Sequence, residues 1–347
     1  MKEIYFNPYM LILARESRGI SQSNLAKELK ISQGLISQIE LKIKSPSIEL
    51  LTRISEKLNY PISFFSIDWR IYSGFSFHRK RKSLGLRLLN TIDARINIQL
   101  IHLVKLLNSV EIIHYDIPFY DIDEFDSIKL IAQSLRTKWK IPKGPIDNLV
   151  KFVEQNGAIV ILFDFYNDKI DGLSIKVDKL PPVFFLNKFL SGDRLRFTLA
   201  HELGHIIMHD SQKKDIEKEA HNFASEFLMP EDEIKHQLQN INLDTLFDLK
   251  RYWKVSAQAL LVRAEKLNTI SENKKSYLWA QINKFGYRKK EPIDIMVETP
   301  STLKLLIDMH NKQLGYSNEQ LSKILNIKLN EFESMYQFQN NNLKIIK

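Results

Sequence analysis

The segment RFTLAHELGHIIMH, at residues 196–209, holds the residue types best suited to chemistry. His201 and His205 are four positions apart, so on a helix their imidazoles face the same side and can share one metal ion. Glu202 lies beside them, where it can take a proton from a metal-bound water and return it to a leaving amine. Two core histidines without a metal are the alternative, but apolar neighbours would bury them, and burial of unpaired histidines is costly. The spacing therefore favours a metal site with Glu202 as its catalytic residue.

A catalytic zinc site needs three protein ligands and one open position. The chain has no cysteine, so the third ligand must be His, Asp or Glu. His209 continues the spacing but lies two helical turns from His201, roughly 12 Å at about 1.5 Å per residue, so we expect it to support the site. The third ligand is then expected from a second helix, EKEAHNFASEFLMP at 217–230, which offers Glu217, Glu219, His221 and Glu226.

The segments around these residues alternate between helical and strand-like patterns. Residues 157–165 form a dense run of β-branched and aromatic residues, and LSIKV and residues 181–187 read as two more short strands. Apolar residues recur every three or four positions in the helical segments. The sequence thus predicts an α+β, mostly helical fold with a small sheet beside helices. The expected helices cover about residues 84–107, 126–140, 145–155 and 193–208.

Residues 21–58 have the spacing of a helix-turn-helix. Ser21 and Ser32 can each cap a helix, and Ile31 anchors the turn between them. The outer face of the second helix carries short or amide side chains that can reach base edges in a major groove. These are Gln33, Gly34, Ser37 and Gln38.

This stretch, SQSNLAKELKISQGLISQIE with the helix that follows, resembles the lambda-repressor-like (Xre) helix-turn-helix family. The resemblance implies a five-helix DNA-binding domain over residues 1–66. It also implies base contacts from Gln22, Gln33 and Ser37, and phosphate contacts from Lys42 and Lys44. A small helical bundle used for protein contacts is the alternative.

Positive charge is concentrated at the same end of the chain. Of the net charge of +9, residues 1–100 supply most, with 16 Lys and Arg against 8 Asp and Glu. This asymmetry favours a nucleic-acid partner for the N-terminal third. The run Arg79–Lys82 could follow a phosphate backbone, although a solvated linker is the more common explanation.

RFTLAHELGHIIMH followed by EKEAHNFASEFLMP resembles the ImmA/IrrE family of metallopeptidases, and the likeness extends over nearly the whole chain. The resemblance implies a zincin-like domain at residues 111–265 in which Glu219 completes the His201 and His205 ligand set. It implies one Zn²⁺ per chain, although a His/His/Glu set also accepts Mn²⁺ or Fe²⁺. It further implies cleavage of a protein substrate, namely a helix-turn-helix repressor or antitoxin, to control gene expression.

The remaining expectations concern organisation and partners. A basic linker and connecting helix should cover residues 67–110, and a helical C-terminal region residues 266–347. Residues 316–332 echo a helix-turn-helix pattern, for which a protein-contact module is the simpler interpretation. We expect a cytoplasmic protein without a membrane partner that binds a double-stranded DNA operator, with a homodimer as an option.

Two questions stay open from the residues alone. Tyr166, Arg196 and His221 are candidate donors for the oxyanion that forms at the scissile carbonyl, and Arg136 reads as structural. The competing function is a DNA-binding repressor or antitoxin-like regulator without proteolysis, whose peptidase fold serves as a sensor or dimerisation body.

Overall fold

The computed structural model describes residues 5–69, 85–110, 117–125, 127–177, 180–209 and 215–336. It divides into two compact units: residues 1–112 with 303–347, and residues 113–302. The expected domain boundaries stay predictions, and the basic run Arg79–Lys82 lies outside the described residues. Among the helices described, none has the length and apolar character to cross a membrane.

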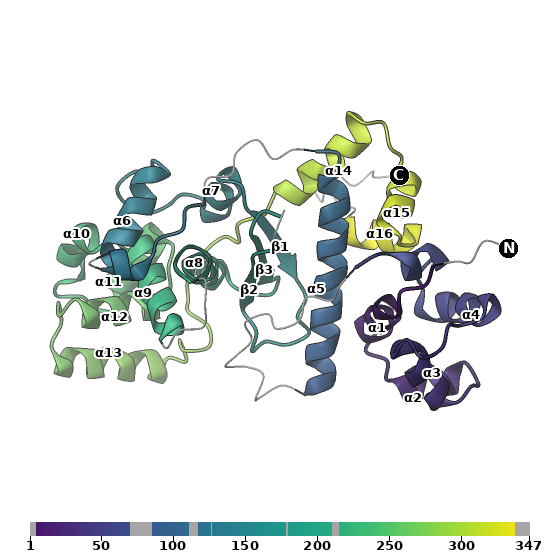
Figure 1. The fold of residues 1–347 in the computed structure, drawn as a ribbon. Coiled ribbons are helices and arrows are strands. Elements are labelled where there is room, and N and C mark those ends of the chain that lie inside the picture. Colours follow the sequence, from purple (N-terminus) through teal and green to yellow (C-terminus); the bar gives the residue numbers. More distant parts are fainter. Residues whose placement is uncertain are drawn as a thin grey trace, which may run out of the picture. The chain divides into compact units, whose positions relative to one another are not determined.

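The first unit is entirely helical in its described residues and combines both ends of the chain (Figure 1). Ser21, Ser32 and Ser47 cap three of its helices by accepting a hydrogen bond from a backbone N–H three residues later. Its elements are α1 (Pro8–Ser17), α2 (Gln22–Glu28), α3 (Gln33–Glu40), α4 (Ile48–Leu58), the 3-10 helix η1 (Ile62–Ser66), α5 (Leu86–Leu107), α14 (Thr302–Lys312), α15 (Asn318–Leu325) and α16 (Leu329–Tyr336).

One hydrophobic core joins the early and late helices of this unit. Met10 and Ile36 from the N-terminal helices share it with Ile101 of α5 and Phe332 of α16, all at most 2% exposed. The C-terminal helices α14–α16 are therefore part of the first unit's fold, because separating them would expose this apolar surface.

The second unit is the mostly helical α+β domain that the sequence predicts. In its three-stranded sheet, β3 lies between β1, to which it is parallel, and β2, to which it is antiparallel. The elements are η3 (Ile122–Glu124), α6 (Ile128–Lys138), α7 (Leu149–Gln155), β1 (Ile159–Phe163), β2 (Gly172–Ile175), β3 (Val183–Asn187), α8 (Gly192–Met208), α9 (Ile216–Leu228), α10 (Glu231–Ile234), η4 (Lys235–Leu238), α11 (Leu243–Trp253), α12 (Ala257–Lys266) and α13 (Glu272–Lys284).

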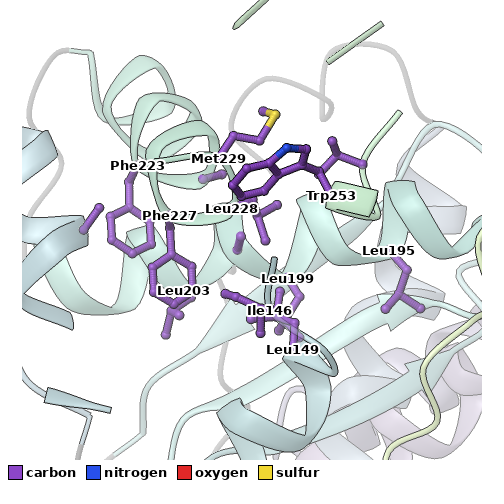
Figure 2. Packing of buried hydrophobic residues seen from close by; sticks show 14 of the residues in the cluster. Ile146, Leu149, Leu195, Leu199, Leu203, Phe223, Phe227, Leu228, Met229 and Trp253 are labelled. Atoms are coloured by element: carbon purple, nitrogen blue, oxygen red, sulfur yellow. The ribbon is translucent and has the colours of Figure 1, made fainter. Parts of the chain in front are cut away.

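The core of the second unit holds α8 and α9 against their neighbours (Figure 2). Phe223 and Phe227 stack with ring centroids 5.2 Å apart, and Leu203 of α8 and Trp253 of α11 lie in the same cluster. Such close packing restricts both helices, so side chains projecting from them have fixed starting points.

Buried charged side chains stabilise this unit through ion pairs and hydrogen bonds to backbone carbonyl oxygens. Lys250 is almost fully buried and donates to both Asp193, at the start of α8, and Glu291. Arg136 donates to the carbonyl oxygens of Phe227, Pro142 and Gly144, which confirms its expected structural role. Because each charge has hydrogen-bonded partners, burial does not leave it uncompensated.

Candidate metal centre and nucleic-acid interface

The approach of α8 to α9 depends on Gly204, the fourth residue of the His-Glu-Leu-Gly-His run. A Cβ at this position would lie 3.0 Å from Cδ1 of Phe223 and 3.3 Å from Cα of Ala220. Only glycine lets the two helices approach this closely without displacing the neighbours. The close packing brings the first turn of α9, with its carboxylates, beside the histidines of α8.

His201, His205 and Glu217 form the group that could hold a metal ion in the described part of the chain, with one ligand atom from each within 4.8 Å of the others. The two Nε2 atoms are 3.1 Å apart, and the Glu217 carboxylate lies 3.6 Å from His201 and 3.4 Å from His205. Ligands about 2.1 Å from a tetrahedral zinc ion lie about 3.4 Å from one another, so this arrangement fits a divalent ion. The hydrogen bonds to His201 and His205 hold the pKa of Glu217 far below its usual range, which keeps the carboxylate ionised.

Glu219, the ligand implied by the family resemblance, has a different neighbour. Its Oε2 lies 3.0 Å from Nε2 of His209, whose Nδ1 lies 3.0 Å from Nδ1 of His205. Glu217 and Glu219 are two positions apart on α9, about 200° around the helix axis, so their carboxylates leave the helix in different directions. His209 thus touches both His205 and Glu219, in the supporting position that its spacing predicts, and the role of Glu219 as ligand stays a prediction.

Burial first, and then the neighbouring His205, lower the pKa of His209 below its ordinary value. The neutral imidazole is the form that can accept a hydrogen bond from one partner while donating to another. His209 can therefore orient His205 and the α9 carboxylate together, as outer-shell groups do around protein metal sites.

Glu202 is held by a residue that the sequence analysis missed. Ser174 of β2 donates a hydrogen bond of 2.8 Å from its hydroxyl to Oε2 of Glu202. The contact requires β2 to lie against α8, and Gly172 permits this, since a Cβ there would come within 2.9 Å of Cγ2 of Thr198. Nothing in the local sequence marks Ser174, because the contact crosses from the sheet to the helix.

The three candidate oxyanion donors have different surroundings. Arg196 is fully buried, paired with Glu298 and 2.6 Å from the carbonyl oxygen of Ile146, which argues against this candidate as an oxyanion donor. Its side chain leaves α8 toward the interior, where an ion pair compensates the buried charge. Tyr166 is 60% exposed in the turn after β1.

His221 is the candidate that lies near the cluster. Its ring is 5.0 Å from that of Phe197, one helical turn before His201. Burial, and then the charge of His201, lower its pKa. A cleft of about 580 Å³ is lined by Phe197, His221 and residues of α12 and α13, and offers room for a bound side chain on this side of α8.

On the first unit, an ordered polar chain leads to the predicted reading face. Arg15 is buried and pairs with Glu40 through bonds of 2.6 and 2.9 Å. Glu40 accepts from the amide of Gln22 at 2.7 Å, and Gln22 accepts from the amide of Gln33 at 2.8 Å. A buried ion pair thereby fixes two of the amides expected to contact DNA, which lowers the entropy that they lose on binding.

The other expected contacts have the exposure that a reading face needs. Gly34, Lys42 and Lys44 are exposed, and Ser37 and Gln38 are partly exposed. A Cβ at Gly34 would meet nothing within 4 Å, so its lack of a side chain has no packing cause inside the unit. The DNA contacts themselves stay predictions.

Comparison with known protein families gives two matches. A helix-turn-helix family model matches residues 11–65, and a peptidase family model described as the IrrE N-terminal-like domain matches residues 153–265. None of the curated proteins matches the chain. Residues 11–65 are thus similar to a helix-turn-helix family and residues 153–265 to the IrrE N-terminal-like domain of a peptidase family, which is the pairing that the sequence resemblance implies.

Proposed function

We propose that the chain is a DNA-tethered zinc endopeptidase that controls gene expression by cleaving another protein. The observation that carries this proposal is the convergence of His201 and His205 with the carboxylates of α9, beside a Glu202 that Ser174 holds in place. A scaffold without chemistry would have no need for this set. Because the partner of its helix-turn-helix domain is DNA, we place the protein in the cytoplasm.

His201 and His205 would hold the ion together with a carboxylate of α9, and His209 would orient this set. Zinc, when bound, supplies Lewis acidity and lowers the pKa of a water molecule. Glu202 would accept a proton from the water that attacks the peptide carbonyl and deliver it to the leaving amine as the C–N bond breaks. Ser174 keeps the Glu202 carboxylate oriented by donating to one oxygen, which leaves the other for this proton.

The sheet indicates how a peptide would lie beside these groups. Within the described residues β2 pairs with β3 along one side, and its other side is an edge. An extended peptide can add to such an edge through its main-chain hydrogen bonds. Since Ser174 of β2 contacts Glu202, this edge would bring a scissile bond to the catalytic carboxylate.

We further propose that the substrate is a repressor or antitoxin that itself carries a helix-turn-helix. Both proteins would then bind neighbouring DNA sites. Tethering on one duplex raises the effective concentration of substrate without any new contact between the two proteins.

Metal content tests the site. Purified chain should contain about one ion per polypeptide by elemental mass spectrometry, and His201→Ala should lose it. His236→Ala removes an exposed histidine elsewhere in the unit and should leave the metal in place. Glu217→Gln and Glu219→Gln, measured side by side, identify the carboxylate ligand. A wild-type chain that binds no zinc after dialysis against it would overturn the proposal.

Activity is tested with Glu202→Gln, which should keep the metal and lose cleavage. New protein N-termini are compared by mass spectrometry in cells that express the wild type or the variant. Termini present only with the wild type identify the substrate. If both proteins produce the same termini and the same transcript levels, the chain regulates without proteolysis.

A further inference from the structure

The C-terminal helices repeat the helix-turn-helix at the start of the chain. Residues 304–336 align with residues 8–40 at a constant offset of 296, without a gap. Helix α16 (Leu329–Tyr336) corresponds residue for residue to α3 (Gln33–Glu40), and α14 and α15 correspond to α1 and α2 with ends that differ by no more than two positions. Six residues around the turn are identical in the two segments. The pairs are Gly19 and Gly315, Ser21 and Ser317, Leu25 and Leu321, Lys27 and Lys323, Leu29 and Leu325, and Ile31 and Ile327.

The backbone geometry repeats with the sequence. Gly19 and Gly315 have φ of 64° and 71°, and the turn residues Lys30 and Asn326 have φ of 53° and 57°. Each turn is closed by a backbone bond of 3.0 Å, from the N–H of residue 31 or 327 to the carbonyl oxygen of residue 26 or 322. Such agreement in left-handed positions defines the same turn, so residues 302–336 form a second helix-turn-helix fold.

The second fold differs from the first at two of the positions expected to read DNA. Leu329 stands where the first fold has Gln33, and Glu333 stands in place of Ser37. A carboxylate at that position would be repelled by phosphate, and a leucine offers no hydrogen bond to a base edge.

The second fold instead contacts the first. The carboxylate of Glu331 on α16 lies 3.1 Å from the guanidinium of Arg18, at the end of α1, and accepts from Asn59, at the end of α4, at 2.8 Å. Tyr336 lies 2.6 Å from Nδ1 of the buried His102 on α5. Figure 1 shows α15 and α16 beside α5, on which the two folds meet.

We propose that this degenerate helix-turn-helix takes the place of a second copy of the chain, so that one polypeptide with one reading helix occupies each DNA site. In a symmetric helix-turn-helix dimer the same surface of two identical domains meets across a two-fold axis. Here the second fold is covalently attached and covers the Arg18 and Asn59 surface of the first with α16, the counterpart of the reading helix. An unlike, attached domain in this place would remove both the need for a second chain and the two-fold symmetry of the DNA site.

The first test is stoichiometry. Duplexes of about 30 base pairs are selected from a randomised pool on the full chain, and the complex is measured by native mass spectrometry. The expected result is one chain of 40.7 kDa per duplex and an enriched motif without two-fold symmetry. Two chains on a two-fold motif would overturn the proposal. If no motif is enriched, the same count on an unselected duplex at low protein excess decides between one chain and two.

The second test asks whether α16 reads DNA. Asn330→Ala and Ser334→Ala alter α16 at the positions that correspond to Gly34 and Gln38, and both should leave affinity for the selected duplex within about twofold. Gln38→Ala on α3 should lower it about tenfold. A loss of affinity from the α16 variants equal to that from the α3 variant would show a second reader. These measurements do not depend on metal or proteolysis, so they can fail or succeed whatever the fate of the proposed peptidase.

Discussion

The candidate metal cluster and the expected DNA-reading face position their polar groups in opposite ways. The cluster lies between two helices whose close packing leaves little room for a side chain at Gly204. The expected reading face lies on the exposed side of α3 and at the start of α2, and its amides are ordered by hydrogen bonds that run back to the buried pair of Arg15 and Glu40. A metal site needs several elements fixed against one another, whereas a groove-reading helix needs only its own surface and a firm base.

Substitutions at two glycines, one in each region, should give the largest difference between the metal cluster and the reading face. Gly204→Val should destabilise the second unit by about 3 kcal/mol, since its side chain would overlap Phe223, and should lose the metal. Gly34→Val has open space around it and should change stability little, but its added bulk should weaken DNA binding. Thermal unfolding, metal content and duplex affinity are measured on both variants. If both lost the same stability, metal and affinity, the metal cluster and the reading face would not be positioned in different ways.

The two units should also differ in how their stability depends on pH, because a buried histidine lies in the first unit. His102 in the first unit is fully buried, and burial lowers its pKa to about 3. The unfolded chain takes up the proton near pH 6.5, so stability is fully present above that value and falls as the pH drops toward 3. Between pH 7 and pH 5 this site alone should cost about 2 kcal/mol.

His102→Gln should remove that pH dependence while keeping a polar side chain. The exposed His236→Gln in the second unit serves as its control and should leave the dependence unchanged. The free energy of unfolding in urea is measured at each pH, with hydrogen exchange of the α5 amides as the readout. An equal loss of stability on acidification in His102→Gln and wild type would exclude His102 as the cause.

On the reading face, Gln33→Ala should cost about 1.5 kcal/mol of discrimination between the selected site and a site with one changed base pair. Its amide is exposed and already oriented by Gln22, so the loss should concern specificity more than stability. Competition binding with matched and mismatched duplexes measures this. Equal weakening on all duplexes would instead assign Gln33 to phosphate contact.

The smallest effect is expected at Glu202, the proposed catalytic carboxylate. Ser174→Ala removes the hydroxyl that orients Glu202 and should lower cleavage about fivefold, or about 1 kcal/mol, with unchanged metal content. Ser174→Thr keeps the hydroxyl and should retain most of the activity. A loss of metal in Ser174→Ala would mean that the residue supports the whole site rather than Glu202.

What could be predicted from the sequence follows the same division. His201, Glu202 and His205 lie on one helix, so their spacing alone places them together, and the serine-capped helices of the reading domain are equally local. Contacts between elements that are distant in the chain cannot be predicted from local residue spacing. Ser174 reaches Glu202 from the sheet, and the inward path of Arg196 depends on Glu298, about a hundred residues later.

The α9 carboxylate shows the limit most clearly. From the sequence alone, Glu217 and Glu219 are equally plausible ligands, because both lie in the first turn of α9. The family resemblance favours Glu219, whereas the described geometry favours Glu217. Which one approaches the histidines depends on how the first turn of α9 is rotated against α8, and residue spacing does not encode that rotation.

The chain leaves the first unit near residue 112 and returns to it at residue 303. During synthesis, residues 113–302 emerge complete while α5 still lacks the helices that cover it, because Phe332 and Tyr336 are among the last described residues to appear. The second unit can therefore fold on the ribosome before the first unit is finished. A nascent chain stopped just before residue 303 would carry the whole second unit, but the apolar surface of α5 that packs against Phe332 and Tyr336 would stay exposed to solvent.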